Sequence, residues 1–287
     1  MRATTGAAVA AALGSDIASH RSIGGGSINE AFACLLSDGR DVFVKTNRGT
    51  DPRMFPCEAR GLAWLAEANA VRVPKVLAVN DVDAGEQLLV LELLVAGRRQ
   101  KDYEERLGRG LARLHRFGAP SFGFFEDNFL ATLAQDNSER DDWASFYVEQ
   151  RLEPLVRRAV DHGHVGASWP RKFDRIFANM AQLAGPAEPP ARLHGDLWSG
   201  NLHADAAGGP VILDPAVYGG HREIDLAMLR LFGSPSPRFF DAYDEVYPRA
   251  PGHADRVKLY QLYPLLAHVN LFGGGYVGST EAALAAY

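Results

Sequence analysis

Apolar and polar positions alternate through much of the first third of the chain, and this period of two residues is typical of β-strands. Two such runs fill residues 28–48 on either side of Ser37–Asp38–Gly39, and Asp-Gly between apolar runs favours a β-hairpin. The Ala-rich N-terminus predicts a helix instead. The other elements predicted here are a helix over 56–69, strands over 71–79 and 86–94, and a turn at 81–85.

Beyond Gly97 the pattern changes, because apolar residues recur every three or four positions, as on one face of a helix. The segments with this spacing are 102–117, 173–183, 224–231 and 262–269. Val211–Leu213 is the only strand expected in this half. Strands followed by helices predict an α+β fold of two lobes. We place a small antiparallel sheet with one helix in residues 1–96, and a larger, mainly helical lobe in residues 97–287.

Composition adds limits on the class of protein. The 287 residues are 47% hydrophobic and 23% charged, which is typical of globular chains. The net charge of −5 disfavours a nucleic-acid partner or a polybasic membrane contact. Two cysteines allow no disulfide framework, and no apolar run approaches the ~20 residues of a membrane span. Because the N-terminus resembles a helix more than a signal peptide, we expect a soluble, cytoplasmic protein.

The segment HGDLWSGN at 194–201 carries the main chemical signal, together with the strand that ends at Asp214. Asp196 and Asn201 are five positions apart, and with Asp214 they have the layout of a kinase catalytic loop and its metal-binding aspartate. Phosphoryl transfer requires hard oxygen ligands for Mg²⁺ and an acceptor for the substrate hydroxyl proton. We therefore predict Asp196 as the catalytic base, and Asn201 and Asp214 as magnesium ligands.

The first lobe supplies residues that a kinase also needs. Lys45 ends a predicted strand, where a cation can bind ATP phosphates, and Glu58 lies near the start of the next helix, where it can pair with Lys45. The alternative for 194–201 is a polar loop with an Asx-capped turn, and the order of Lys45 and Glu58 ahead of it favours the kinase interpretation. Glycine lets backbone N–H groups approach phosphate, so we predict a loose phosphate cover formed by Gly24, Gly25, Gly26 and Ser27.

Differences from protein kinases concern the acceptor. Asp214 is followed by Pro215 and Ala216 rather than Phe-Gly, and Asp225 comes only 11 positions later. This leaves little room for the activation loop with which protein kinases bind a peptide. A small-molecule acceptor fits better.

The chain resembles the fructosamine (ketosamine) kinase family, within the aminoglycoside/choline-kinase-like branch of the protein-kinase-like superfamily. The resemblance rests on GGGSINEAF at 24–32, VFVKTN at 42–47, HGDLWSGN at 194–201 and DPAVYGGHREIDLAM at 214–228, with further matches at 71–76, 141–152 and 260–276. It implies an ATP- and Mg²⁺-dependent phosphotransferase that acts on O3′ of ribulosamine or fructosamine adducts. The acceptor would be a small molecule, a glycated amine or a protein lysine, and the product's breakdown would reverse glycation. A monomer or a homodimer is compatible with it.

The resemblance also implies residue roles. It makes residues 1–96 the nucleotide-binding lobe and residues 97–287 the catalytic and substrate-binding lobe, with backbone groups from Glu92 to Leu94 meeting the adenine. Trp198 would pack against the sugar or its ammonium through a cation–π contact, or else lie structurally under the loop. Asp225 would brace the catalytic loop. The remaining predicted substrate residues, with a surface position as the alternative, are His221 and Glu223.

Other functions stay open at this point. An aminoglycoside, choline or a free sugar could replace the ketosamine as acceptor. A pseudokinase without turnover is disfavoured by the intact set of five residues, Lys45, Glu58, Asp196, Asn201 and Asp214. The spacing of His194, Asp196, His203 and His221 matches no zinc template. Ser27 stands where some family members carry a cysteine, which argues against redox regulation through that position.

Overall fold

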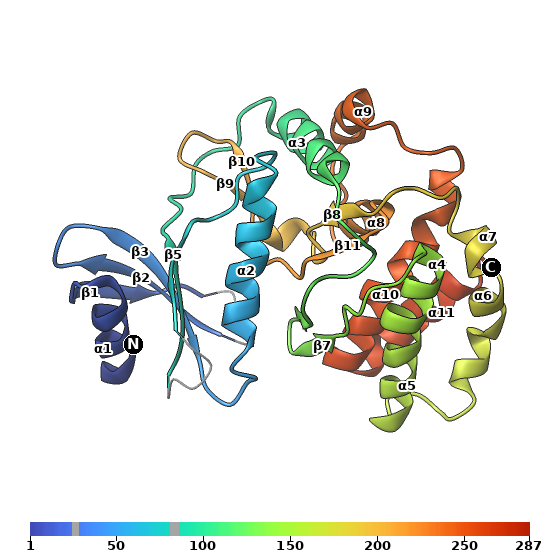
Figure 1. Cartoon of the computed structure of the whole chain (residues 1–287), viewed down its shortest axis with the longest axis horizontal. Helices are drawn as coiled ribbons and strands as arrows, with labels where there is room; N and C mark the ends of the chain where they lie inside the picture. The colour runs from blue at the N-terminus through green and yellow to red at the C-terminus, as the bar shows by residue number, and fades with distance from the viewer. Residues whose placement is uncertain (25–28, 81–85) are drawn as a thin grey trace. The chain divides into compact units, whose positions relative to one another are not determined.

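The chain divides into two compact units, whose helices and strands are drawn in Figure 1. A computed structural model describes residues 1–24, 29–80 and 86–287. Unit 1 comprises Met1–Tyr103 and Leu202–Pro215, and unit 2 comprises Glu104–Asn201 and Ala216–Tyr287. The chain therefore leaves unit 1 after Tyr103 and returns to it about 100 residues later, at Leu202. The predicted functional division into lobes at residue 96 stays a prediction.

A sheet in the order β1-β2-β3-β5-β4 forms the centre of unit 1, and all its neighbouring strands are antiparallel. The elements of this unit's first segment are α1 (Ala3–Leu13), β1 (Ile17–Ser22), β2 (Glu30–Leu36), β3 (Asp41–Asn47), α2 (Met54–Glu67), β4 (Val76–Val79) and β5 (Gln87–Glu92). The predicted hairpin is confirmed, since β2 and β3 pair with Phe32 opposite Val44. The N-terminal helix is confirmed as well.

The two faces of this sheet have different partners, and this positions Lys45. Val44 and Val90 pack in a cluster with Val9 of α1, whereas Leu89 and Leu91 pack against Phe55 of α2 and its neighbours. Figure 1 shows α1 and α2 on opposite faces of the sheet. Side chains alternate along a strand, so Lys45, the residue after Val44, lies on the opposite face of the sheet from Val44. This is the face that α2 covers.

Some predicted elements differ in extent. The helix predicted at 56–69 begins at Met54, and Pro56 is accommodated in its first turn, where a missing N–H costs no helical hydrogen bond. The strand predicted at 71–79 is confirmed only from Val76, since Arg72 makes a parallel bridge to Val211 instead. Strand β1 was not predicted. The turn predicted at 81–85 lies outside the described residues.

Unit 2 is mainly helical, as predicted. Its helices are α3 (Tyr103–Phe117, its first residue in unit 1), α4 (Trp143–Phe146), α5 (Glu153–Asp161), α6 (Asp174–Ala178), α7 (Met180–Leu183), α8 (Glu223–Leu231), α9 (Pro237–Val246), α10 (His253–Phe272) and α11 (Val277–Leu284). A π-helical segment, Tyr147–Leu152, joins α4 to α5, and 3₁₀ segments occur at Trp169–Lys172, Ser199–Asn201 and Gly274–Tyr276. The helix predicted over 173–183 is interrupted at Asn179. Helix α10 contacts α5, α8 and α11.

The expectation of a single strand after residue 97 was wrong. Six short strands occur in the described residues: β6 (Asn128–Leu130), β7 (Leu133–Gln135), β8 (Ala191–Leu193), β9 (Leu202–Ala204), β10 (Pro210–Ile212) and β11 (Tyr218–Gly220). Each is three residues long, which is too short for alternation to be recognised. β8 pairs with β11, and the hairpin of β9 and β10 belongs to unit 1.

Throughout the described part of the chain, every helix falls short of the length or apolar character that crossing a membrane would require.

Candidate active site

Lys45 joins three elements of unit 1. Its Nζ donates hydrogen bonds of 2.7 Å to Oε1 of Glu58 on α2 and 2.7 Å to Oδ1 of Asp214, which follows β10. The Lys45 residue is 6% exposed. The sheet register places Lys45 under α2, and the β9–β10 hairpin brings Asp214 to the same point. The cation and both carboxylates predicted for the nucleotide site are therefore in contact.

Electrostatics keep this ammonium charged. Burial lowers the pKa of Lys45, but the carboxylates of Glu58 and Asp214 outweigh burial and raise that pKa above its ordinary value. One ammonium between two carboxylates leaves an excess negative charge. The Asp214 side chain remains 52% exposed. A divalent cation fits this donor chemistry, because a carboxylate with open surface is a hard oxygen ligand.

Asp214 adopts a backbone conformation that few residues other than glycine tolerate. Its φ is +53°, in the left-handed region, where aspartate is several-fold enriched among non-glycine residues. The turn follows directly after β10 and precedes Pro215. This local bend sets the direction in which the Asp214 carboxylate leaves the chain.

The loop at 194–201 is anchored within unit 2 by Asp225 of α8. Asp225 Oδ2 accepts a hydrogen bond of 2.8 Å from the His194 N–H, and Oδ1 accepts one of 2.9 Å from the Gly195 N–H. These are the hydrogen bonds expected between Asp225 and the loop. The Ala216 N–H donates to the His194 carbonyl at 2.9 Å. Backbone groups on both sides of the turn are thus held by the interior of unit 2.

Gly195 is required by geometry. Its φ is +81°, and a Cβ built there would lie 2.0 Å from the Ala216 carbonyl oxygen. No other residue type fits this position without moving backbone.

Asn201 orients Asp196 within the same loop. Its Nδ2 donates to the Asp196 carbonyl at 2.8 Å and to Asp196 Oδ2 at 3.0 Å. Because the amide nitrogen is engaged in this way, the amide oxygen is the atom that Asn201 can offer to a cation. The side chain therefore fits the predicted magnesium ligand by its chemistry.

The predicted residues thus fall into two sets. Lys45, Glu58 and Asp214 are in contact in unit 1, and Asp196 and Asn201 are in contact in unit 2. Gly24, shortly after β1, is exposed, and a Cβ there would meet no neighbouring atom. The predictions for Gly25, Gly26 and Ser27 lie outside the described residues.

Glu92, at the end of β5, has a structural contact that its sequence position did not suggest. Its Oε2 accepts 2.9 Å from Arg72, and Oε1 accepts 3.0 Å from the Lys75 N–H. Arg72 also donates at 2.9 Å to Asp205, in the turn between β9 and β10. Arg72 therefore ties the end of β5 to the hairpin that precedes Asp214, and sequence analysis missed it. Leu94, predicted beside the adenine, is half-buried.

Trp198 is partly exposed and also makes contacts within its own unit, and its role toward the substrate stays a prediction. It is 37% exposed, so its ring is available to a ligand. The ring also lies edge-on to Phe232 at 6.2 Å between centroids, and a Cβ at Gly200 would lie 2.2 Å from it. The indole is thus held by its own loop and by the end of α8.

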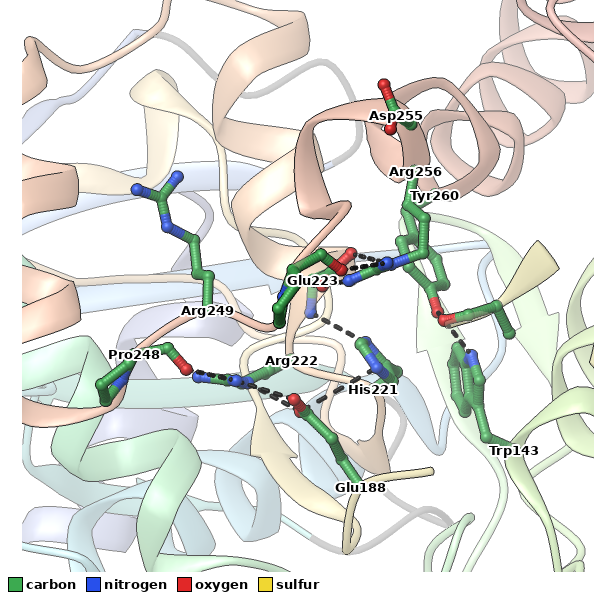
Figure 2. A network of polar contacts seen from close by, with 12 residues as sticks. Trp143, Glu188, His221, Arg222, Glu223, Pro248, Arg249, Asp255, Arg256 and Tyr260 are labelled. Carbon is green, nitrogen blue, oxygen red and sulfur yellow. Dashed lines mark hydrogen bonds and ion pairs between the residues drawn. The ribbon is translucent and has the colours of Figure 1, made fainter. Parts of the chain in front are cut away.

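His221 and Glu223 are buried, so the alternative of a surface position for them was wrong. Figure 2 shows their surroundings within unit 2. Both Glu223 oxygens accept hydrogen bonds from Arg256, at 2.6 and 2.9 Å. The His221 ring stacks on Tyr260 at 5.0 Å, and its Nε2 lies 3.9 Å from Glu188. Burial lowers the pKa of His221 to about 4. The substrate role predicted for His221 and Glu223 stays a prediction.

Comparisons with known proteins agree in sequence and in structure. A protein of Synechocystis sp. named as a probable ketoamine kinase is 41% identical over 273 residues, which cover 93% of this chain and 90% of that protein. A chloroplastic protein-ribulosamine 3-kinase of Oryza sativa subsp. japonica is 38% identical, over 93% of this chain and 78% of that protein.

Solved structures extend the similarity. The crystal structure of a protein from Thermobifida fusca, assigned as a fructosamine-3-kinase, superposes with a TM-score of 0.90 at 38% identity, covering 98% of this chain and 97% of that one. Choline kinase from Streptococcus pneumoniae has a TM-score of 0.67 at 17% identity, covering 98% and 97%, and this likeness shows the shared fold alone.

The sequence model of the fructosamine kinase family matches residues 1–287, the full length printed here. The α+β fold and the family predicted from the sequence are both confirmed. With a kinase-like loop and a buried lysine held by two carboxylates, the chain belongs to the fructosamine kinase family, a family of phosphotransferases that act on a hydroxyl group.

Proposed function

We propose that the protein transfers the γ-phosphoryl group of ATP to O3′ of a ketosamine, a sugar joined to an amine through its ketose form. Family membership supports the class of reaction. The observation that carries the assignment to this chain's residues is Lys45, held at 2.7 Å by Glu58 and at 2.7 Å by Asp214. Such a lysine binds ATP phosphates in kinases of related architecture.

The nucleotide side of the proposal uses the residues of unit 1. Lys45 binds phosphate oxygens, and Glu58 of α2 holds its ammonium through the 2.7 Å hydrogen bond. Asp214, with the amide oxygen of Asn201, would hold Mg²⁺, which when bound neutralises charge on the phosphates. Backbone groups from Glu92 to Leu94 meet the adenine.

The acceptor side uses the loop of unit 2. Asp196 accepts the proton of the attacking sugar hydroxyl, while Asn201 keeps its carboxylate in one orientation through the 3.0 Å hydrogen bond to Oδ2. Trp198 offers an indole face to the amine end of the ketosamine, where an ammonium gains a cation–π contribution. Phosphorylation at O3′ makes the adduct unstable, and its breakdown releases the amine.

The proposal also concerns which molecule bears the ketosamine group and where in the cell the protein acts. A glycated protein lysine and a free glycated amine both present the same ketosamine group. A cytoplasmic location and a monomeric or homodimeric state stay predictions from the sequence.

The test is a turnover measurement. Purified protein with Mg-ATP is given ribulosamine, erythrulosamine and fructosamine derivatives, with choline and kanamycin as controls, and ADP release is followed. Turnover on a ketosamine with none on the controls is expected. Turnover on choline or kanamycin only would overturn the proposal, and ATP binding without turnover on any compound would favour a pseudokinase.

Asp196→Asn tests the assigned base. We expect kcat to fall by about 10²–10⁴-fold while ATP affinity, measured by calorimetry, is retained. Asp161→Asn makes the same change at an exposed position of unit 2 and serves as the control. Loss of ATP binding in Asp196→Asn would show that this carboxylate does not act as the base.

A further inference from the structure

Three polar side chains form a buried hydrogen-bonded series behind the catalytic loop, within unit 2. Tyr243 of α9 lies 2.8 Å from Nδ1 of His115 on α3, and Nε2 of His115 lies 3.2 Å from Oδ2 of Asp225 on α8. The exposed fractions of Asp225, His115 and Tyr243 are 0%, 1% and 0%. Three helices therefore each contribute one polar group to a buried site, and no part of the proposed reaction uses His115 or Tyr243.

The hydrogen bonds on both sides of His115 fix the orientation of its ring. An ionised Asp225 can only accept, so His115 Nε2 carries the hydrogen that it donates to Oδ2. On the other side of the ring, Nδ1 lies 2.8 Å from the Tyr243 hydroxyl. Contacts at both nitrogens fix the plane of the imidazole, so Tyr243 helps to hold Nε2 against Asp225.

The charge on Asp225 depends on this arrangement. Burial raises the pKa of Asp225, but the hydrogen bond from His115 and those from the loop outweigh it, and the pKa lies below its ordinary value. A fully buried carboxylate without such donors would lose its charge or its orientation.

Asp225 transmits this orientation to the loop. Oδ2 is shared by His115 Nε2 and the His194 N–H, while Oδ1 accepts from the Gly195 N–H. Three donors from two directions define the plane of the carboxylate. Gly195 is bonded directly to Asp196, so a rotation of the carboxylate would move the proposed base.

We propose that His115 and Tyr243 are positioning residues for the reaction: they fix the carboxylate of Asp225 and, through it, the place of Asp196. Neither residue touches the substrate. The inference rests on the proposed function, because it requires Asp196 to be the base.

A further set of contacts joins α8 and α9, the helices that carry Asp225 and Tyr243. Arg222, directly before α8, donates two hydrogen bonds of 2.7 Å to Glu188 and further bonds to the carbonyls of Tyr247 and Pro248, which follow α9. Figure 2 shows Arg222 between Glu188 and Pro248. The start of α8 and the residues after α9 are thereby joined, which links the helices that carry Asp225 and Tyr243.

The experiment compares two tyrosine variants that each lose one buried hydroxyl. Tyr243→Phe removes the hydrogen bond of 2.8 Å to His115, and Tyr147→Phe removes a hydrogen bond of 2.8 Å to the Leu259 carbonyl in the same unit. We expect kcat on a ribulosamine derivative to fall about 10-fold in Tyr243→Phe, because small displacements of a catalytic group are costly, and to stay at the wild-type value in Tyr147→Phe. The KM values for ATP and ribulosamine should stay within about 2-fold.

A second pair of variants changes His115 and tests whether a conservative substitution recovers activity. His115→Leu removes both hydrogen bonds, and we expect kcat to fall about 100-fold. His115→Gln keeps an N–H that can reach Asp225, and we expect it to recover part of that loss. Thermal unfolding of each variant confirms that the assays are run on folded protein.

The outcomes separate the two proposals. Equal kcat values in Tyr243→Phe and Tyr147→Phe, or no recovery in His115→Gln relative to His115→Leu, would overturn the positioning inference. A rise in KM with unchanged kcat would overturn it too, because it would indicate a binding role. Asp196→Asn is measured alongside: if it retains turnover, the proposed base itself is wrong, whatever the other variants do.

Discussion

Lys45 Nζ donates a hydrogen bond of 2.7 Å to Asp214 Oδ1, although the two residues are 169 positions apart. The contact exists because the chain returns to unit 1 after residue 201 and adds the β9–β10 hairpin to it. Arg72 secures this return, since its carbonyl accepts from the Ile212 N–H at 3.0 Å and its side chain binds Asp205. The nucleotide site proposed for unit 1 is therefore assembled from two distant segments.

Lys45→Met should both inactivate and destabilise the protein. Loss of the phosphate ligand is expected to lower kcat/KM by more than about 10²-fold. Removing the cation also leaves Glu58 buried without its partner, which costs about 3 kcal/mol in the free energy of unfolding. Steady-state kinetics and urea unfolding measure the two effects.

Lys172→Met is the matched control for that change. Lys172 pairs with Glu281 at 2.7 Å, but their side chains are 51% and 40% exposed, so the loss should stay below about 1 kcal/mol. Wild-type kcat/KM in Lys45→Met would contradict the proposed nucleotide site.

Gly195→Ala should disrupt the catalytic loop. The left-handed backbone costs about 1 kcal/mol for alanine, and the clash with the Ala216 carbonyl adds to it, so we expect a total above about 2 kcal/mol and a large loss of kcat. Gly163→Ala separates the two causes, because Gly163 has φ +70° but open space around its Cβ position. Thermal unfolding and turnover of both variants provide the comparison, and equal destabilisation would rule out the steric cause.

Trp198→Ala should weaken ketosamine binding specifically. Without the indole face we expect the ketosamine KM to rise about 10-fold while the ATP KM changes little. Trp198→Phe keeps an aromatic face and should show a smaller rise. Equal increases in both KM values would instead indicate that Trp198 supports the loop through its contact with Phe232.

Acid should destabilise the protein through His221. An unfolded histidine takes up its proton near pH 6.5, whereas burial in the native protein lowers the pKa of His221 to about 4. Between these values the unfolded state binds more protons, so the free energy of unfolding falls as the pH falls from 6.5 to 4, by about 3 kcal/mol in total.

Urea unfolding of wild-type protein and His221→Phe across pH 7 to 4.5 isolates this contribution. Phenylalanine can retain the stack on Tyr260 but does not titrate. We expect a clearly smaller acid loss in the variant. Parallel pH curves for the two proteins would show that His221 does not control acid stability.

Local pattern accounts for the parts of the fold that were predicted correctly. The Asp-Gly turn and its flanking alternation specify the β2–β3 hairpin, and the period of the apolar residues specifies α3, α8 and α10. The three-residue strands were missed because they have too few positions to show a period. β8 and β11 are defined by their pairing with each other, as in Leu193 opposite Tyr218, and not by their composition.

The sequence by itself determined the family, the α+β class and the types of side chain available for phosphoryl transfer, because these depend on local patterns and on motifs of consecutive residues. Only the tertiary structure decided which of them meet. The contacts of Lys45 with Asp214, of Arg72 with Asp205 and of His115 with Tyr243 join residues 169, 133 and 128 positions apart. Such contacts depend on the packing of whole elements and on the dry interior that makes each polar group need a partner, and neither is written in any local stretch of the chain.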